Sequence, residues 1–353
     1  MFSSEVTEVT KVMSNIELTE VTLLDLLKKC PDISTLIFKN ILILRQTSKT
    51  IYDMLKNANR IAIKNKEDYI FPNGEGLLEK LNSLNEWSTV IELDLIKCYL
   101  GDVGVREIAS MLRVNSTLHA LALSDNNIRA DGARAIAEAL RKNSTLHALA
   151  LDRNKIGADG ARTFAEALRV NSTLHTLNLS SNDIGDDGVL AIANMLKVNN
   201  TLEKLYIGLN NIGANDINMQ AIAVRAIAQA LHVNSRLKTL SLLACRTYCD
   251  GAKEIASMLR VNKTLLNLNL ECNGLGTDGA RIIVEALCVN TTLQNLNIAC
   301  NFIKRAQTIA SMLCVNSTLT TLNLECNHNL LEDDREAILK SWRKFNRVGT
   351  LKI

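Results

Sequence analysis

Aromatic rings and chain breakers are scarce in this sequence. Only 4% of its 353 residues are aromatic, and it has two prolines, Pro31 and Pro72. The core must therefore be built from Leu, Ile, Val and Ala, and no Pro-rich or Gly/Ser-rich linker marks a domain boundary. The formal net charge of +3 is small for this length, so it gives no electrostatic reason to expect nucleic acid or an anionic membrane as the partner.

Targeting and membrane signals are also missing. No run of about 18 apolar residues occurs, so we expect no membrane-spanning helix. The first residues, MFSSEVTEVTKV, carry acids and lack a basic segment followed by an apolar one, which argues against a secretory signal peptide. We therefore expect a cytoplasmic protein. The alternative is translocation into a host cytosol by a route that needs no such signal.

Repetition is what the chain has in abundance. The segment from Leu146 to Thr173, LHALALDRNKIGADGARTFAEALRVNST, begins again almost unchanged at Leu174, and a near-copy starts at Leu118. Each copy reads L-x-x-L-x-L-x-x-N, then a Gly/Asp turn, then an Ala/Leu-rich segment. A period of 28 residues is typical of a solenoid. The first position of successive repeats is Val90, Leu118, Leu146, Leu174, Leu202, Leu237, Leu265, Leu293 and Leu319.

The residues of the repeat predict its local structure. Positions one, four and six are apolar, as a short strand with one buried face requires, and position nine is Asn in most repeats, where its amide can bond turn backbone. Aspartates that precede a glycine, such as Asp131 and Asp159, are predicted to cap the following helix. The Asn near the end of each copy, such as Asn143, is predicted to be the left-handed residue that ends a helix.

The distribution of repeats predicts three parts. Residues 1–89 form an N-terminal cap with degenerate repeats, including a weak strand at Arg60–Ile63. Residues 90–330 hold nine regular repeats of about 28 residues. Residues 331–353 form a C-terminal cap, with an amphipathic helix and a last strand near Leu351.

One step in the array is longer than the others. The step from Leu202 to Leu237 carries seven extra residues, around Asn215–Ala221. Because seven residues are close to two helical turns, the helix start is expected to project while Ile222 and Ile227 stay on the packed face.

The repeat resembles that of the ribonuclease-inhibitor-type leucine-rich repeat family, with Asn or Cys at position nine. The resemblance covers Val90 to about Leu330. It implies an α/β horseshoe solenoid with parallel strands on the concave face and helices on the convex face. The uniform copies and Asn-Ser-Thr-Leu junctions are similar to those of leucine-rich repeat effectors of intracellular bacteria and of innate-immune receptors. The chain lacks the GxxxxGK[ST] nucleotide-binding motif of such receptors.

Catalytic motifs give no support for an enzyme. The sequence has no HExxH and no GxSxG. A GxGxxG pattern occurs at Gly274, Gly276 and Gly279, but the last two are the repeat's own glycines, and no acidic residue ends the next strand to hold a ribose. We therefore predict a non-enzymatic protein without a cofactor or a metal.

Two columns of chemically active side chains recur along the array. Position eight holds three of the nine cysteines: Cys272, Cys300 and Cys326. Position two holds three histidines: His119, His147 and His175. Stacked cysteines could approach disulfide distance, but the odd count and the absent secretory signal favour reduced thiols. The histidines could form a metal ladder, but solvated copies of one residue are favoured because no carboxylate or thiol joins them at fixed spacing.

We expect the binding function at places on the concave face where the residues differ from those of the other repeats. Positions three, five, seven and eight should point to that face. Their charged residues are six acids and three bases: Glu92, Asp94, Asp125, Asp152, Glu271, Glu325, Lys97, Arg153 and Lys204. An acidic, amide-rich face suits a polypeptide with a basic or neutral surface and argues against a phosphate backbone. Tyr206 is the only aromatic residue in these columns, and together with the insertion it marks the expected centre of binding.

These observations predict a protein–protein interaction module, expected to be monomeric. The predicted partner-binding residues are Lys204, Tyr206, Leu209, Leu243, Asp152, Arg153, Glu271 and Glu325. A bacterial effector that captures a host protein is one form of this role. The alternative is a GTPase-activating protein of the leucine-rich repeat type, for which Arg153 is the candidate arginine.

Overall fold

The strands form one parallel sheet that follows the order of the sequence. The computed structural model describes residues 60–62, 90–213, 217–344 and 349–353. Within these ranges the strands are β1 (Arg60–Ala62), β2 (Glu92–Asp94), β3 (Ala120–Ala122), β4 (Ala148–Ala150), β5 (Thr176–Asn178), β6 (Lys204–Tyr206), β7 (Thr239–Ser241), β8 (Asn267–Asn269), β9 (Asn295–Asn297), β10 (Thr321–Asn323) and β11 (Thr350–Lys352). Each strand pairs with the next in repeat register, so that Leu121 lies opposite Leu149.

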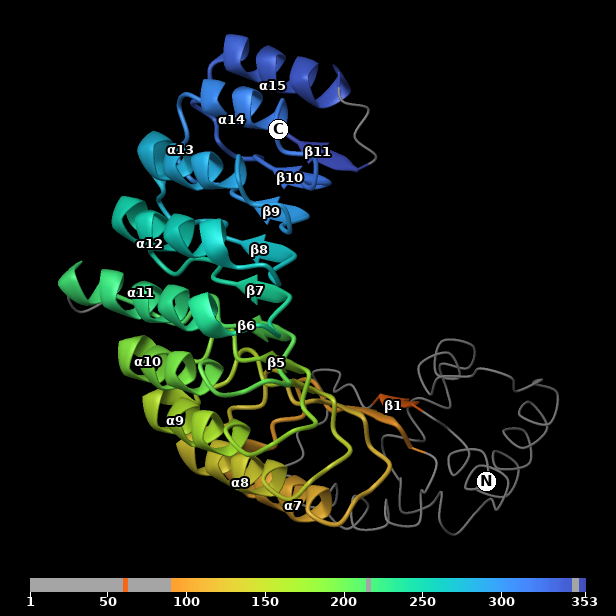
Figure 1. Ribbon diagram of the computed structural model, residues 1–353. Helices are drawn as coiled ribbons and strands as arrows, with labels where there is room; N and C mark the ends of the chain where they lie inside the picture. The colour runs from red at the N-terminus through yellow and green to blue at the C-terminus, as the bar shows by residue number, and fades with distance from the viewer. Residues whose placement is uncertain (1–59, 63–89, 214–216, 345–348) are drawn as a thin grey trace, which may run out of the picture.

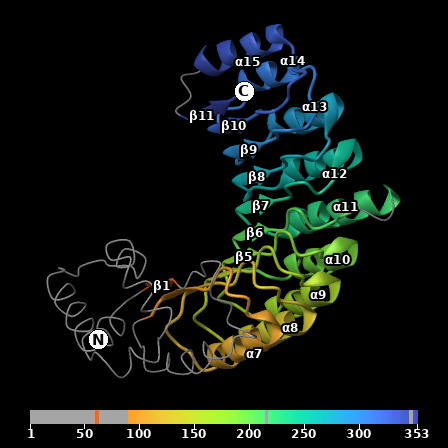
Figure 2. The same ribbon diagram turned by 180° about the vertical axis from the view of Figure 1, so that it is seen from behind.

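The helices form a second layer behind the sheet. They are α7 (Gly101–Leu112), α8 (Ala130–Leu140), α9 (Gly157–Leu168), α10 (Gly185–Leu196), α11 (Ile217–Val233), α12 (Tyr248–Val261), α13 (Gly276–Leu287), α14 (Gln307–Leu313) and α15 (Glu332–Lys344). Figures 1 and 2 show the helices along the outer, convex side and the strands along the inner side. The α/β solenoid predicted from the repeat is confirmed. No helix among the described residues is both long and apolar enough to cross a membrane.

The core lies between the two layers and runs the length of the array. In the copy that starts at Leu146, the apolar positions one, four and six are at most 1% exposed. Phe164 fills the space between this strand and α9. Small residues let neighbouring helices approach closely, since a Cβ on Gly160 would lie 2.9 Å from the Cβ of Ala133 on α8. A chain poor in aromatic rings thus forms its core from aliphatic layers.

The asparagines at position nine form the predicted ladder. The Oδ1 of Asn126 accepts from the backbone N–H groups of Cys98 and Leu100, at 2.9 and 3.3 Å. Its Nδ2 donates to the carbonyls of Leu95 and Ser124, at 2.8 and 3.1 Å. Each buried amide therefore bonds the backbone of the preceding repeat as well as its own, which joins neighbouring repeats.

The asparagines near the ends of the helices form a second ladder, and the predicted left-handed conformation is wrong. Asn115, Asn143 and Asn171 do not have a positive φ. Instead Asn143 donates to the carbonyl of Leu112 at 2.8 Å and accepts from the N–H of Leu146 at 2.8 Å. The side chain bonds to the preceding repeat, and so it has a structural role at the opposite edge of the strands.

The predicted helix caps are also wrong. Asp159 lies inside the first turn of α9, where it pairs with Arg162 at 2.7 Å, and the side chain of Ile156 before the helix makes no capping bond. A cap comes instead from the preceding repeat: the Asp102 carboxylate accepts from the N–H groups of Arg129 and Gly132, at 2.7 and 3.1 Å, at the start of α8. Because the helices stack side by side, an acid on one can reach the orphan N–H groups of the next.

Both ends of the array continue the sheet. The weak strand predicted at Arg60–Ile63 is present as β1, in parallel register with β2. The predicted last strand is β11, and α15 covers the end of the helical layer with Ile338 and Trp342 buried. The remaining features predicted within residues 1–89 lie outside the described ranges, and the three-part division remains a prediction.

Candidate functional site

Four of the predicted partner-binding residues lie together on two neighbouring repeats. Lys204 and Tyr206 belong to β6, and Leu209 follows it at position eight with 49% of its surface exposed. Leu243 follows β7 and is partly buried. The backbone N–H of Leu209 donates to the carbonyl of Leu243 at 2.8 Å, so the two leucines are neighbours. We call these four residues the Tyr206 patch.

A glycine explains how Leu243 is seated in the patch. Gly208 occupies position seven of its repeat, and a Cβ there would lie 2.8 Å from both the Cβ and the carbonyl oxygen of Leu243. Real side chains do not approach so closely, so only glycine allows this approach. Leu243 can therefore pack directly against the backbone of Gly208, whereas a side chain at position 208 would push it away from the sheet.

The other predicted residues lie away from this patch along the face. Asp152 and Arg153 follow β4, two strands before β6, or about 10 Å at ordinary strand spacing. The Asp152 carboxylate accepts from the Ser124 hydroxyl at 2.6 Å and from the Asn178 amide at 2.9 Å. Arg153 is exposed and has a left-handed backbone, with φ of 57°. The structure thus fixes the acid and leaves the guanidinium exposed.

Glu271 and Glu325 lie beyond the patch, toward the C-terminal end. Glu271 accepts from the Asn297 amide at 2.8 Å, which repeats the arrangement of Asp152. Glu325 pairs with Lys352 at 3.6 Å. Lys352 belongs to β11, outside the regular repeats, so the sequence columns did not include it. Counting it, the charged side chains that the structure describes on this face are six acids and four bases, a smaller acidic excess than predicted.

The start of α11, which contains the described part of the seven-residue insertion, does not join the Tyr206 patch. As predicted, the start of α11 projects beyond its neighbours, but it does so on the helical side, away from β6 and β7 (Figures 1 and 2). Ile222 is 39% exposed and is not packed as expected, whereas Ala223, Val224 and Ile227 are buried. The extra turns therefore lengthen the convex side and leave the concave face unchanged.

The histidine column is stacked and not convergent. The ring centroids of His119 and His147 are 4.9 Å apart, and those of His147 and His175 are 5.2 Å apart. His119 and His175 each bond a backbone carbonyl through Nδ1 at 2.6 Å. None of the three histidines belongs to the group of mutually close metal-ligating atoms among the described residues. Partial burial, followed by the charges of His119 and His175, lowers the pKa of His147.

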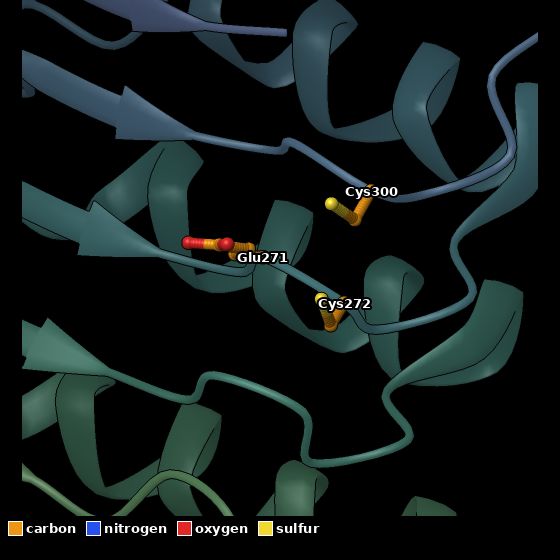
Figure 3. Close-up of side chains that lie close together, drawn as sticks. All are labelled: Glu271, Cys272 and Cys300. Carbon is orange, nitrogen blue, oxygen red and sulfur yellow. The ribbon is translucent and has the colours of Figure 1, made fainter. Parts of the chain in front are cut away.

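The cysteine column brings thiols together next to an acid. Cys272 and Cys300 follow β8 and β9, and Figure 3 shows both side chains beside Glu271. One ligand atom from each of the three residues lies within 4.8 Å of the other two. Burial and the neighbouring thiol and carboxylate groups raise the pKa of Cys300, although its bond with Cys326 opposes this. The sequence placed the thiols in one column but did not join Glu271 to them; the recurring Glu-Cys pair at 271–272 and 325–326 was the available signal.

Three exposed aromatic residues among those the structure describes were not predicted: Tyr99, Tyr248 and Phe302. Tyr248 is 45% exposed and holds a left-handed φ of 46° at a position where several other repeats have glycine. Its ring lies against Gly274 of the following repeat, where a Cβ would be 2.8 Å from the ring. Phe302, two repeats after Tyr248, is 71% exposed with φ of 58°. Aromatic residues in such conformations are uncommon, and Tyr248 in the place of glycine was the signal in the sequence.

Comparison with protein families identifies the repeats. Residues 114–137, 142–165 and 170–193 match the Leucine Rich repeat family, and residues 204–304 match the TMOD/LMOD Leucine-rich domain. The second match contains the Tyr206 patch and the cluster of Glu271, Cys272 and Cys300. No curated protein matches the sequence significantly.

Solved structures show the same kind of fold. The leucine-rich repeat-containing protein LegL7 from Legionella pneumophila aligns over 83% of this chain and 93% of its own, with 15% identity and a TM-score of 0.51. Leiomodin-1 Actin-Binding Site 2 aligns over 45% of this chain and 89% of its own (22% identity, TM-score 0.37). The tropomodulin C-terminal domain of Caenorhabditis elegans aligns over 44% and 92% (14% identity, TM-score 0.37). The chain is a leucine-rich repeat protein, with a solenoid similar in fold to that of LegL7.

Proposed function

We propose that this chain is a protein-binding module whose partner docks on the concave strand face, centred on the Tyr206 patch. The observation that carries the proposal is Leu209, which is 49% exposed, neighbours Leu243 and follows Tyr206 in the same repeat. Position eight in the other eight regular repeats is charged, small or a cysteine. An exposed leucine that neighbours a second leucine, in a repeat that also carries an aromatic residue on the same face, is typical of the few residues that dominate binding energy at interfaces.

The surroundings of the patch support a polypeptide partner. Asp152 on one side and Glu271 on the other are held by neighbouring amides, which fixes their oxygens before a partner arrives. Fixed acceptors favour partner N–H groups and cationic side chains, because little side-chain entropy remains to be lost on binding. The acidic excess of the face disfavours a phosphate backbone.

Quantitative capture tests the proposal. Immobilised protein is incubated with cell lysate, and bound proteins are compared between wild type and the variants Tyr206→Ala and Leu243→Asp. Each variant is expected to reduce capture of the specific partner by at least about tenfold, since loss of an interface hot spot costs about 2 kcal/mol or more. Val170→Asp, a change at a 62% exposed site outside the strand face, is the matched control and should leave capture unchanged. Undiminished capture by both patch variants would overturn the proposal.

The origin of the partner is a finer part of the same proposal. The resemblance of the uniform repeats to bacterial effectors supports a host protein as the partner. Lysates of eukaryotic and bacterial cells should then differ, with specific capture from the eukaryotic lysate alone. Capture from the bacterial lysate alone would exclude the effector role while leaving the binding role in place.

GTPase activation is the second candidate function. It is supported by Arg153, which is exposed on the concave edge beside a fixed carboxylate. An arginine supplied to a GTPase stabilises the charge that develops in the transition state and typically accelerates hydrolysis by about 10³ to 10⁵. Single-turnover GTP hydrolysis across a panel of small GTPases, with wild type against Arg153→Ala, tests it. Equal rates with and without the protein would rule it out.

A further inference from the structure

The cluster of Glu271, Cys272 and Cys300 brings metal-ligating atoms together outside the Tyr206 patch. Glu271 and Cys272 are adjacent in the connection after β8, and Cys300 lies in the connection after β9 (Figure 3). The carboxylate oxygen and the two sulfurs all lie within 4.8 Å of one another. Two neighbouring repeats therefore supply three ligand atoms to one place at the edge of the concave face.

The backbone that carries these side chains is fixed. Cys272 and Cys300 both have left-handed φ values, 57° and 54°, so their side chains leave the backbone in the same sense. The N–H of Cys272 donates to the carbonyl of Ala299 at 3.1 Å, and the N–H of Cys300 donates to that of Glu325 at 2.9 Å. These bonds continue the strand ladder into the connections, so a ligand entering the cluster meets thiols that are already positioned.

The carboxylate is also positioned. Asn297 donates to Oε2 of Glu271 at 2.8 Å, and the N–H of Glu271 donates to Asn269 at 2.9 Å. A bond of this kind to one carboxylate oxygen holds the group in place and leaves its other oxygen for a metal, as outer partners do in established metal sites.

We propose that Glu271, Cys272 and Cys300 form a binding site for a thiophilic divalent cation of the zinc class. Two thiolates and one carboxylate are ligands that Zn²⁺ accepts, at about 2.3 Å from sulfur and 2.0–2.2 Å from oxygen. Calcium and magnesium take oxygen ligands and are disfavoured by the two sulfurs. Three protein ligands leave the fourth tetrahedral position for water or for a group of another molecule.

Cys326 is not part of the proposed site. It follows β10 and interacts with Cys300 from the side opposite Cys272, and it does not belong to the group whose ligand atoms are all mutually close. Its own neighbouring acid, Glu325, is paired with Lys352 at 3.6 Å. The two sides of Cys300 therefore differ. On the Cys272 side, Glu271 bonds to the neutral amide of Asn297, whereas on the Cys326 side, Glu325 is already paired with the cationic Lys352.

Cobalt substitution tests the site on the full chain under reducing conditions. Co²⁺ is titrated into the protein while the thiolate-to-cobalt charge-transfer band is followed, and Zn²⁺ is then added to displace it. One equivalent is expected to produce the band, and Zn²⁺ is expected to remove it and to raise the unfolding midpoint. Cys272→Ser and Cys300→Ser should each lose the band and the rise in midpoint. Asn297→Ala should weaken binding by about tenfold or more, because it releases the carboxylate.

Matched variants keep the test decisive. Serine already occupies position eight with a left-handed backbone at Ser181, so Cys→Ser changes there are compatible with folding, and circular dichroism verifies it. Cys326→Ser and the exposed Cys288→Ser should bind as wild type does. The proposal is overturned if Cys272→Ser retains the band, if Cys326→Ser or Cys288→Ser abolishes it, or if the wild type shows none.

Discussion

Gly208 lies directly beneath Leu243, one repeat away on the concave face. A Cβ at Gly208 would come within 2.8 Å of the Leu243 Cβ and of its carbonyl oxygen. That carbonyl also accepts from Leu209 at 2.8 Å. The shape of the Tyr206 patch therefore depends on a residue that contributes no side chain to it.

Replacing Gly208 by alanine is expected to destabilise the protein and to displace Leu243. Overpacking of a close contact typically costs about 1–3 kcal/mol, and here the obstructing atoms include backbone. Urea unfolding measures the change in the free energy of unfolding. Ser180→Ala, at the same position of the preceding repeat, is the control and should change it by less than about 0.5 kcal/mol. Equal stability of the Gly208→Ala and Ser180→Ala variants would contradict the close approach of Leu243 to the Gly208 backbone.

Asn273 should be among the most sensitive residues of the position-nine ladder. Its Oδ1 accepts from Cys245 N–H, Thr247 N–H and the Thr247 hydroxyl, at 3.0, 3.1 and 2.7 Å. Its Nδ2 donates to the carbonyls of Leu242 and Glu271, at 2.8 and 3.0 Å. Asn273→Ala leaves these buried groups without partners, at about 1–3 kcal/mol for each group that water does not reach. We expect a loss of about 3 kcal/mol or more in urea unfolding.

An exposed asparagine provides the comparison for Asn273. Asn211 donates to Asp183 at 2.6 Å at the surface, where water can replace the bond. Asn211 has a left-handed backbone, with φ of 54°, so the control change is Asn211→Gly, which glycine tolerates and which should change the free energy of unfolding by less than about 0.5 kcal/mol. If Asn273→Ala and Asn211→Gly unfolded at the same urea concentration, the position-nine ladder would not have the stabilising role assigned to it.

Capping between repeats gives a third prediction. Asp102 accepts from Arg129 and Gly132 at the start of α8, whereas Asp159 pairs only with Arg162 on its own exposed helix surface. Asp102→Ala is expected to cost about 1 kcal/mol, the usual effect of losing a cap, and Asp159→Ala about half of that or less. Thermal unfolding of the two variants measures the difference. A larger loss for Asp159→Ala would restore the capping role predicted from sequence.

The strands were predictable because their signal is local and periodic. The apolar residues at positions one, four and six locate β2 to β10, and the weaker run at Arg60–Ile63 correctly gave β1. The caps and the second asparagine ladder were assigned wrongly because their bonds cross to the neighbouring repeat. Asp102 and Asn143 bond to residues about one repeat period away in the sequence. When a single repeat is considered alone, the only bonding partners it offers are nearer in the sequence, and these are incorrect.

The candidate site was only partly predictable for the same reason. Repeat register placed Tyr206, Leu209 and Leu243 on neighbouring strands, and this follows from counting positions. Spacing predicted that the start of α11 projects, but register could not show that it does so on the helical side, away from the strand face. Nor could it show that a carboxylate oxygen of Glu271 lies within 4.8 Å of the sulfurs of Cys272 and Cys300, because the position of the acid is set by its bond to Asn297.

Thiol reactivity should separate the buried cysteines from the exposed ones. Burial raises the pKa of Cys98 and of Cys245 to about 12, so at pH 8 roughly one thiol in ten thousand is ionised. Brief alkylation of the native protein, followed by peptide mass spectrometry, should modify the exposed Cys288 and Cys314 well before either buried thiol. Alkylation in denaturant, where all sites should react alike, is the control. Rapid native labelling of Cys245 would contradict its burial.

The histidine column predicts that stability falls in mild acid. Partial burial and the flanking His119 and His175 lower the pKa of His147 in the folded protein below its ordinary value of 6.5. The unfolded chain then binds more protons below about pH 6.5, so the stabilisation present above that pH is lost as the pH falls through the lowered folded pKa. His147→Gln removes the titrating group and should flatten the decline in unfolding free energy between about pH 7.5 and about pH 5.5. An equal slope in wild type and His147→Gln would show that the stacked rings do not couple protonation to folding.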